Sequence, residues 1–575
     1  MELILKIPNF QLHGKKCFHS RMAPCVIFED EHLLVVNKPA VWNTHAPSPY
    51  AGEGIYDWLR AREPRWSSLA ILHRLDKETS GILVFGKTSL ANKSLTEQFA
   101  ERRIRKKYAL LTDREIPQKE FVAKTKLVRV GEKYASRNLN SPTGEIAKTK
   151  FLRAENFEFE IQNSDFQIIP PSPKIKILCA EPLTGRTHQI RVHASENGFP
   201  ILGDVLYGGT PAARVFLHAA EIEFMHPATN EPMTFFAPAN FAQSHQVVTC
   251  SFNFALRAAI IEPEATNAFR LIHGASDGWP GWFVEKLGDF LLSQSEKPLN
   301  AIQKKELFRF AEIYSSRGVY HKILSRQVRR STMTEVSPQL IFGKAAPERF
   351  EILENGARYE MSFSEGYSVG LFLDQRDNRR RFLTGYVATN FALFQSAIGN
   401  RQPAILNVFA YTCGFSVCAA KAGAKTTSLD LSKKYLEWGR RNFMLNDLDP
   451  TAHNFIYGDA FDWLRRLAKK GRAFDAAALD PPTFSQSKEH GAFRVEQDFG
   501  KLVAAALPLV KPEGVLFAST NAADWPPEKF FVAVDAAIHM ARRKILQKHY
   551  FPQPPDFPVS RAEPAYLKTA WMRID

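Results

Sequence analysis

From about residue 347 onward, strand-like and helix-like segments follow one another in turn, and few folds accept that order. Apolar runs such as AILNVFA, TTSLD and FDAAALD are separated by stretches such as KKYLEWGRRNFMLN, whose apolar residues recur at helical spacing. Parallel strands need a crossover connection, so this rhythm is typical of a parallel sheet with helices on both faces. We therefore expect an α/β doubly wound domain over residues 347–575.

The first part of the chain has a different texture, with short apolar runs separated by clusters of Gly, Pro, Asn and Asp. CVIFED, HLLVVNKPA, GILVFGKT and YALLT are examples of these runs. They predict an α+β domain with a mixed, largely antiparallel sheet over residues 1–255. Prolines loosen the pattern near 230–265, and residues 256–346 have the strands and the amphipathic helix of a smaller α+β domain.

Length and composition fit a globular protein of several domains. A chain of 575 residues is too long for one hydrophobic core and suggests roughly three to four. Its six cysteines include no CxxC pair, so we expect neither disulfides nor a metal site. No apolar run reaches the roughly 18 residues that cross a bilayer, and the N-terminus does not resemble a targeting signal, so we expect a cytoplasmic protein. The net charge of +15 favours a polyanionic partner, because a basic surface gains from counterion release.

The segment HRLDKETSGILVFGKT places Asp76 between Arg74 and Lys77, before a run that reads as a buried strand. Taken alone, such an aspartate caps a turn and is neutralised by its neighbours. Two further segments indicate that Asp76 has a functional role. RRIRKKYALL places Tyr108 beside several cations. PLTGRTHQIRVHA contains other candidate residues, which are Arg186, His188 and Arg191.

In PLTGRTHQIRVHA a glycine turn leads into alternating residues that predict a strand. On this strand Gln189 and Arg191 would point one way and His188 the other. A buried arginine requires an anion, and Asp76 is the expected partner. An adjacent cation lowers the pKa of a carboxyl group, so the pair would keep Asp76 ionised, as a nucleophile or a general base. Tyr108 could offer a stacking face or a phenol, or could be a core aromatic residue.

These segments resemble, in order and spacing, the active-site motifs of the RluA-type pseudouridine synthases, over about residues 25–245. The resemblance implies that Asp76 is the catalytic residue, that Tyr108 contacts the target uridine and that Arg191 pairs with the aspartate. The candidate substrate contacts are Arg74, Arg186 and His188. Members of this family detach uracil from its ribose and rejoin it through carbon, without a cofactor or a metal.

The second part of the chain contains the pattern of a nucleotide-like cofactor site. In ILNVFAYTCGFSVCAAKAGA, a strand with Asn407 leads through Gly414 into a helix, as where a ligand meets a helix N-terminus. Gly414 stands alone in this loop, where richer fingerprints have three glycines. Asp430 closes the next strand, about where an acidic residue accepts hydrogen bonds from ribose hydroxyls, and Asp459 closes the third.

The most specific pattern of this part is FDAAALDPPTFSQSK. Asp480 ends a strand, and Pro481 and Pro482 fix an extended loop because proline restricts φ and donates no hydrogen bond. A plain strand end with a proline turn would look the same. Since the segment follows the candidate cofactor residues in order, we interpret it as a binding loop with Phe484 as a stacking face.

This part resembles the class I S-adenosylmethionine-dependent methyltransferases, whose sheet is doubly wound and Rossmann-like, over about residues 265–575. The string ENGARYEMSFSEGYSVGLFLDQRDNRR narrows the resemblance to bacterial large-subunit rRNA methyltransferases. It implies S-adenosylmethionine as the cofactor and Asp480 as a catalytic residue. The implied cofactor-binding residues are Asn407, Gly414, Asp430 and Asp459. Arg376 is a further candidate cofactor contact, unless it belongs to a solvated basic face with its neighbours Arg379 to Arg381.

Together the two resemblances imply a bifunctional enzyme that forms pseudouridine and methylates a base in structured RNA. We expect ribosomal RNA as the substrate, with tRNA as an alternative. Methylation at C5 of cytosine requires a cysteine thiolate, and Phe493 stands where related enzymes carry it. We therefore predict a guanine nitrogen as the acceptor and keep cytosine C5 as an alternative. The remaining alternatives are an RNA-binding or assembly factor with one active half, and a methyltransferase for proteins or small molecules.

Overall fold

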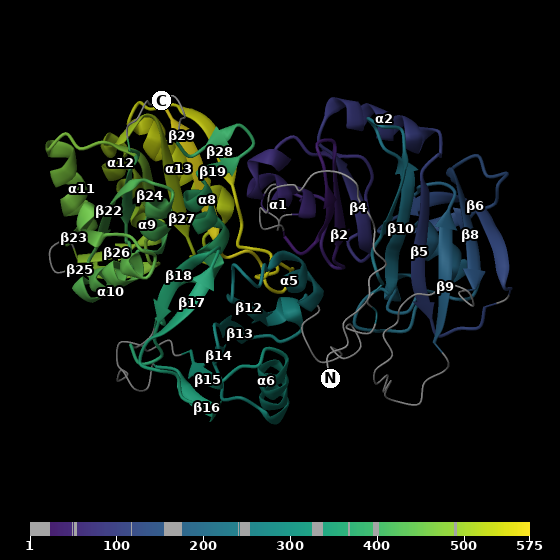
Figure 1. Ribbon diagram of the computed structural model, residues 1–575, viewed down its shortest axis with the longest axis horizontal. Coiled ribbons are helices and arrows are strands. Elements are labelled where there is room, and N and C mark those ends of the chain that lie inside the picture. Colours follow the sequence, from purple (N-terminus) through teal and green to yellow (C-terminus); the bar gives the residue numbers. More distant parts are fainter. Residues whose placement is uncertain are drawn as a thin grey trace.

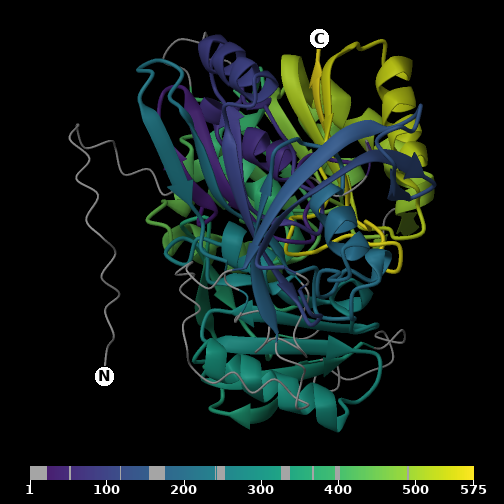
Figure 2. The same cartoon turned by 90° about the vertical axis from the view of Figure 1, so that its right-hand side faces the viewer.

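The computed structural model describes residues 23–48, 50, 54–116, 118–153, 175–239, 241, 253–324, 337–365, 368–394, 402–487 and 491–575. Three larger sheets follow one another along the chain. Figure 1 shows the purple and blue strands of the first, the teal strands of the second and the green and yellow strands of the third. The second sheet lies at the bottom of the molecule in this view and also in Figure 2, where the first sheet is in front. Among the described helices, none has the length and apolar character that crossing a membrane requires.

The first sheet is largely antiparallel, which confirms the predicted α+β texture. Its strands are β1 (Val26–Glu29), β2 (Leu33–Lys38), β3 (Ala70–Ile71), β4 (Ser80–Gly86), β5 (Arg105–Thr112), β6 (Glu120–Val130), β7 (Lys133–Arg137), β8 (Glu145–Arg153), β9 (Lys176–Pro182), β10 (Leu217–Met225) and β11 (Pro232–Phe236). The order is β1-β2-β4-β10-β5-β9-β8-β6-β7, with β3 paired to β4, β11 paired to β10, and β4 parallel to β10. The helices of this part are α1 (Ile55–Arg62), α2 (Ser89–Ala100) and α3 (Gln189–Glu196).

Strands β2 and β4 of the first sheet are buried on both faces. Leu34 and Leu83 lie in one buried cluster, whereas Val35 and Val84 lie in another, which α2 helps to close. Burial on both faces explains why GILVFG shows no alternation between apolar and polar residues. The loop that carries Asp76 therefore leads directly into a rigid strand.

Side chains on the two faces of the second sheet belong to different buried clusters. Its strands are β12 (Ala268–His273), β13 (Trp282–Leu287), β14 (Phe290–Ser295), β15 (Gly318–Ile323) and β16 (Gln339–Gly343), in that order across the sheet. The accompanying helices are α5 (Phe254–Ile260) and α6 (Ala301–Ile313). Leu291 of β14 lies in a buried cluster with residues of the first sheet, whereas Phe290 and Leu292 lie in a cluster with the C-terminal part.

The third sheet has seven strands in a doubly wound arrangement, as the strand–helix alternation predicts. The strands are β21 (Ala404–Val408), β22 (Lys425–Asp430), β23 (Asn454–Tyr457), β24 (Phe474–Leu479), β27 (Val510–Thr520), β28 (Ile545–Tyr550) and β29 (Lys568–Ile574). The order is β23-β22-β21-β24-β27-β29-β28, in which the first five are parallel and β29 is antiparallel to β27. The order reverses between β21 and β24.

Helices cover both faces of the third sheet, and each face has its own buried cluster. The helices are α8 (Arg376–Thr384), α9 (Gly414–Lys421), α10 (Lys433–Met444), α11 (Ala460–Lys469), α12 (Val495–Ala506) and α13 (Pro527–Met540). Three short hairpins complete this part of the chain. They are β17 (Phe350–Glu354) with β18 (Ala357–Met361), β19 (Tyr386–Ala388) with β20 (Phe391–Ala392), and β25 (Phe484–Ser487) with β26 (Gly491–Arg494).

The segment after the glycine turn of PLTGRTHQIRVHA is the helix α3, so the predicted strand is wrong. His188 has a left-handed φ of 56°, and the helix begins at the next residue. The side chain of Gln189 ties this first turn to β8, because its amide donates to the carbonyl of Lys148 at 3.0 Å. Residues 189–194 are all buried. A helix buried on every side lacks the polar stripe that would have marked its period in the sequence.

The first and third parts of the chain meet where α1 lies against β19 and α8. The hydroxyl of Tyr386 donates to the carbonyl of Arg60 at 2.7 Å, and the guanidinium of Arg60 donates to Thr389 at 2.9 Å. Glu63, at the end of α1, accepts a hydrogen bond from Arg380 of α8. These contacts join segments that are more than 300 residues apart in the sequence.

Candidate active sites

A cavity of about 740 Å³ lies beside the loop between β3 and β4. Its lining includes every residue predicted for the first site, namely Arg74, Asp76, Tyr108, Arg186, His188 and Arg191. These residues come from three separate segments of the chain. The structure therefore brings the predicted residues of the first site together.

Two earlier residues hold the loop that carries Asp76. Thr44 donates to the carbonyl of Leu75 at 2.9 Å and accepts from its amide at 3.2 Å. The buried ammonium of Lys38 donates to the carbonyl of Lys77 at 3.3 Å. These bonds fix the backbone on both sides of Asp76, so its carboxylate enters the cavity from a rigid support.

The principal partner of Arg191 is Asp204. Nε and Nη2 of Arg191 donate to the two carboxylate oxygens of Asp204 at 2.7 and 2.8 Å, and the side chains are only 3% and 1% exposed. Nη1 of Arg191 lies 3.8 Å from Oδ2 of Asp76 and 3.4 Å from Glu78. The predicted pair with Asp76 is thus a longer contact within a network, because a buried carboxylate occupies the fork of the guanidinium.

Burial and nearby charges act on Asp76 in opposite directions. Burial is the stronger effect and raises the pKa of Asp76 above its ordinary value, whereas His188, at 3.9 Å, and Arg191 lower it. Arg191 lowers the pKa of Asp76 as predicted, but burial outweighs this effect, so the net shift is upward. Burial also raises the pKa of Tyr108, so this side chain stays a neutral phenol.

Sequence reasoning missed two residues that position the first site, Asp204 and Tyr207. The hydroxyl of Tyr207 lies 2.7 Å from Nδ1 of His188, and the guanidinium of Arg191 lies 5.2 Å from the centre of the tyrosine ring. A signal was present in FPILGDVLYGG, which has one acidic residue in an apolar run. A buried carboxylate in such a run requires a cation elsewhere in the chain.

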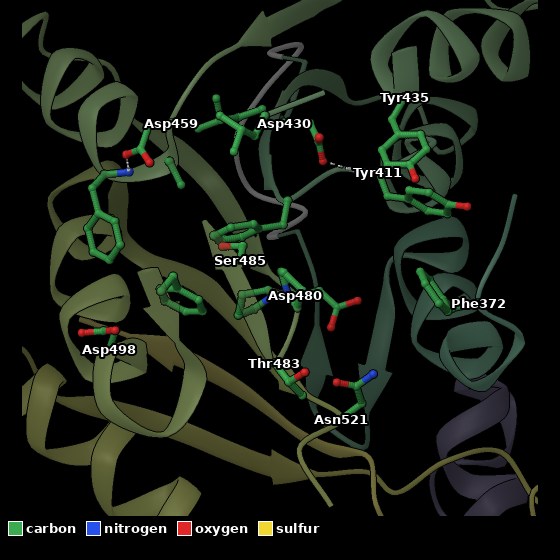
Figure 3. A pocket seen from close by; sticks show the side chains of 18 of the residues that line it. Phe372, Tyr411, Asp430, Tyr435, Asp459, Asp480, Thr483, Ser485, Asp498 and Asn521 are labelled. Atoms are coloured by element: carbon green, nitrogen blue, oxygen red, sulfur yellow. Dashed lines mark hydrogen bonds between the residues drawn. The ribbon is translucent and has the colours of Figure 1, made fainter. Parts of the chain in front are cut away.

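A second cavity, of about 800 Å³, lies at the carboxyl ends of the strands of the third sheet, where the strand order reverses. Figure 3 shows Asp430, Asp459 and Asp480 around this space. Asp430 closes β22, and Asp459 and Asp480 follow β23 and β24 of the same sheet. Pro481 and Pro482 line the cavity as well, so the Asp-Pro-Pro loop forms part of its wall.

The loop between β21 and α9 is held in an unfavourable backbone conformation. Phe409, Tyr411 and Cys413 have left-handed φ values of 60°, 49° and 64°. Such conformations cost of order 1–3 kcal/mol each in residues other than glycine. Asp430 helps to hold the loop, because its Oδ2 accepts from the amide of Tyr411 at 2.8 Å. The loop thus has left-handed residues other than glycine at positions where glycine would adopt this conformation at lower cost.

Aromatic rings form one wall of the second cavity. The ring centre of Phe493 lies 5.9 Å from that of Phe409 and 6.2 Å from that of Phe461. Asp459 lies at the same end, and its Oδ1 accepts from the amide of Phe461 at 2.9 Å, which caps α11. A wall of this kind suits a flat heterocyclic ring. The sequence has phenylalanine instead of cysteine at residue 493, but no local pattern predicts the aromatic wall.

Asp480 is positioned by residues from two other elements. Its Oδ1 accepts from Nε2 of Gln375 at 3.1 Å, and the same nitrogen lies 2.7 Å from the hydroxyl of Ser519. Burial raises the pKa of Asp480 to about 7, and the nearby carboxylate of Asp374 adds to the rise. Asp374 also lines the cavity and accepts from the hydroxyl of Tyr566 at 2.9 Å. No local pattern within FLDQRDNR distinguishes Asp374 from its neighbours as a site residue.

Some residues predicted for the second site lie outside the described lining of this cavity, namely Arg376, Asn407, Gly414 and Phe484. Arg376 is buried and donates to both oxygens of Asp556 at 2.9 and 2.6 Å. Asp556 is completely buried, so its charge requires this arginine. Arg376 therefore forms an internal ion pair with Asp556. The expectation that it contacts the cofactor is wrong, and so is the expectation that it belongs to a solvated basic face.

The other three residues lie in elements next to the cavity, in β21, α9 and β25. Asn407 is completely buried under the loop and donates to the hydroxyl of Ser416 at 2.9 Å. Gly414 begins α9, and a Cβ at this position would lie 3.1 Å from the side chain of Arg379. Phe484 is 38% exposed, and the guanidinium of Arg494 lies 6.0 Å from its ring centre.

Two classes of enzyme are joined in this chain. A doubly wound sheet whose cavity lies at the reversal of strand order is typical of class I methyltransferases, and the first cavity is lined by Asp76 and Arg191, the pair that the resemblance to pseudouridine synthases predicts. The chain belongs to the S-adenosylmethionine-dependent methyltransferase family, which residues 271–573 match. Residues 32–196 match the RNA pseudouridylate synthase family, so the chain carries both enzyme domains.

Relatives of known name align with the methyltransferase part. A ribosomal RNA large subunit methyltransferase from Deinococcus radiodurans is 32% identical over 333 residues, which are 56% of this chain and 77% of the relative. A putative ribosomal RNA large subunit methyltransferase from Bacillus subtilis is 30% identical over 326 residues, or 55% of this chain and 77% of the relative. A solved structure of a putative methyltransferase from Streptococcus mutans is 30% identical, covers 54% of this chain and 75% of its own, and superposes with a TM-score of 0.44.

Proposed function

We propose that this enzyme forms pseudouridine in RNA at the first cavity and methylates a guanine nitrogen of ribosomal RNA at the second. The observation that supports it is the separation of two cavities, each lined by the acidic residues that one of the reactions needs. Ribosomal RNA is favoured because the relatives of the methyltransferase part are named for it and because the chain has a net charge of +15. A cytoplasmic location, where ribosomal RNA is made and modified, is part of the same proposal.

We propose three domains, with boundaries near residues 255 and 346. The first sheet ends at Phe236, and the second runs from Ala268 to Gly343, in agreement with this division. Arg257 of α5 donates to Asp277 at 2.6 Å, which attaches this helix to the second sheet. The third domain then begins with the hairpin of β17 and β18.

At the first cavity we propose that the chain's own groups carry out the reaction without a cofactor. Asp76 attacks the nucleotide or moves its proton, and His188 and Arg191 favour the ionised carboxylate that either role requires. Tyr108 is 7% exposed and, as a neutral phenol, presents its ring to the uracil. The more exposed Arg74 and Arg186 contact the rest of the RNA.

The second cavity has groups that fit S-adenosylmethionine. The carboxylate of Asp430 accepts one backbone hydrogen bond at each oxygen, from Tyr411 and Ser432 at 2.8 Å, which orients its remaining lone pairs for ribose hydroxyls. The aromatic wall next to Asp459 suits the adenine ring. When bound, the cofactor supplies an electrophilic methyl group. Asp480 and the carbonyls of Pro481 and Pro482 then accept hydrogen bonds from the target base.

The burial of the cysteines supports a nitrogen atom as the acceptor of the methyl group. C5 of a pyrimidine becomes nucleophilic only after a thiolate adds to the ring, whereas a guanine nitrogen already has a lone pair. Cys413 and Cys418 are the cysteines of this part of the sequence, and burial raises the pKa of each thiol to about 12. Phe493 lines the cavity at the position expected for a catalytic cysteine. Guanine is favoured because carboxylates accept from its N1–H and amino group.

Incubation of the purified enzyme with S-adenosylmethionine and unmodified ribosomal RNA should yield pseudouridine and a methylguanosine. Nucleoside mass spectrometry after complete digestion measures both products. RNA that contains 5-fluorocytidine should form no covalent adduct with the enzyme. The appearance of 5-methylcytidine, or of such an adduct on a denaturing gel, would contradict the proposed acceptor.

Methylation should increase as the pH rises through about 7, because burial places the pKa of Asp480 there and the ionised carboxylate accepts hydrogen bonds more strongly than the protonated group. Single-turnover methylation from pH 5.5 to 8.5, with pseudouridine formation followed in the same samples as an internal control, measures this. The same raised pKa favours folding most below about pH 4, and that contribution is lost as the pH rises through about 7. Asp480→Asn should remove this loss of stability. A methylation rate that is flat across pH 7 would contradict the assigned role.

A further inference from the structure

The strands β8, β6 and β7 form the outer end of the first sheet, and α3 covers one of their faces. On that face Leu127 of β6 and Ala147 of β8 pack against Val192 of α3. Successive side chains of a strand point to opposite faces, so the even-numbered residues of β6 and β8 lie on the other face. Figure 1 shows β6 and β8 at the end of the molecule farthest from the third sheet.

This other face, called here the basic face, is positively charged. On this face Lys150 of β8 forms an ion pair with Glu120 of β6 at 2.6 Å. The other cations of the three strands on this face are Lys124 and Lys126 of β6, Lys133 and Arg137 of β7, and Lys148 of β8. In the described part of the chain, no acidic side chain forms an ion pair with any of them. Between the cations lie apolar side chains that are about half exposed, namely Val122 at 47%, Val130 at 52% and Ile146 at 49%.

Cations of the basic face stand directly opposite one another across the strands. Lys124 pairs in register with Lys148, and Lys126 pairs with Arg137. Like charges in such positions destabilise a sheet. Lysine on an edge strand can be explained as protection against aggregation, but β6 and β8 are not at the edge. Protection of a sheet edge therefore does not explain why Lys124 and Lys148 stand opposite each other.

The basic face begins where the first cavity ends. Arg186 lines that cavity, and its Nη1 lies 3.0 Å from the carboxylate of Glu145, the first residue of β8. The neighbouring residue, Ile146, belongs to the basic face. An extended polyanion that enters the cavity can therefore continue along β8 onto Lys148 and Lys124.

We propose that the basic face is a second RNA contact, which holds the phosphate backbone of the substrate outside the first cavity. It rests on the proposed function, because RNA is the polyanion that reaches this cavity. A phosphate between two opposed cations relieves their repulsion and releases counterions from the RNA. The repulsion between the opposed cations therefore destabilises the free protein, and bound RNA relieves it.

The test uses the full chain with four substitutions, Lys124→Gln, Lys126→Gln, Arg137→Gln and Lys148→Gln. The matched control has the same change in net charge at exposed lysines elsewhere, Lys304→Gln, Lys305→Gln, Lys421→Gln and Lys470→Gln. Filter binding measures Kd for an in vitro transcript of a large-subunit ribosomal RNA domain between 50 and 200 mM KCl. We expect the first variant to bind about tenfold more weakly at 150 mM KCl, with a salt slope that is less steep by about 0.7–0.9 for each lost phosphate contact.

A thermal unfolding measurement separates this proposal from simple damage to the fold. The first variant should unfold at the same temperature as the wild type or at a higher one, because repulsion on the sheet has been removed. Equal Kd and equal salt slope in variant and wild type would overturn the proposal, and so would an equal loss of binding in the control. Loss of binding to phosphatidylglycerol vesicles with unchanged RNA binding would assign the surface to a membrane instead. Pseudouridine formation on a short stem-loop, assayed in parallel, shows separately whether the proposed function itself holds.

Discussion

Asp76→Asn is expected to abolish pseudouridine formation and to leave methylation unchanged. Asparagine keeps the size of the side chain but can neither attack as an anion nor accept a proton, so we expect a loss of at least about 10²–10⁴-fold. The second cavity is lined by other elements and should keep its activity. Nucleoside mass spectrometry of one RNA sample incubated with each purified variant measures both products together.

Glu78→Gln provides a matched control for this experiment, because it removes the same charge next to the same arginine, at 3.4 Å. It should retain most of the pseudouridine activity. Asp480→Ala should show the opposite pattern to Asp76→Asn, with methylation lost and pseudouridine formation retained. Loss of both products from Asp76→Asn in a folded protein would contradict two independent sites.

Arg191→Leu is expected to destabilise the first domain by about 3–5 kcal/mol, because it leaves the carboxylate of Asp204 buried without its cation. Denaturant unfolding followed by the fluorescence of tryptophans in the first domain measures the loss. Arg191 also lowers the pKa of Asp76, so its removal should shift the pH dependence of any remaining pseudouridine formation upward.

The double variant Arg191→Leu/Asp204→Leu distinguishes a stranded charge from lost packing. If the buried carboxylate causes the damage, the second substitution should restore much of the stability that the first removes. Both single variants should then be less stable than the double one. An Arg191→Leu protein as stable as the wild type would show that Asp204 does not depend on this arginine.

The sequence allowed the sheets and the first site to be predicted, because both depend on local patterns. A run such as GILVFG must be buried whatever surrounds it, and the strand–helix alternation after residue 347 leaves little choice of topology. The residues of the first site belong to long motifs of fixed order, so their meeting in one cavity followed from those motifs. Asp430, Asp459 and Asp480 lie at the ends of strands, and the ends of parallel strands meet at one edge.

The partners of buried arginines could not be predicted in the same way. Arg376 meets Asp556 across 180 residues, and no local pattern in the sequence links the two. Arg191 and Asp204 are only 13 residues apart, but their pairing depends on α3 being a helix, and its uniformly buried residues concealed the helical period. The aromatic wall of the second cavity likewise forms from three elements, so Phe493 acquires its role only in the folded protein.

The two-faced burial of β14 bears on how this enzyme can be inherited. Leu291 belongs to the core shared with the first sheet, and Phe290 and Leu292 belong to the core shared with the methyltransferase. A break before β14 would remove the part of the cluster around Leu291 that the first sheet supplies, and a break after β14 would remove the cluster around Phe290 and Leu292. The two enzyme domains therefore share packing as well as a peptide chain. Both activities consequently pass to each daughter cell as one locus, in a ratio of one synthase site to one methyltransferase site.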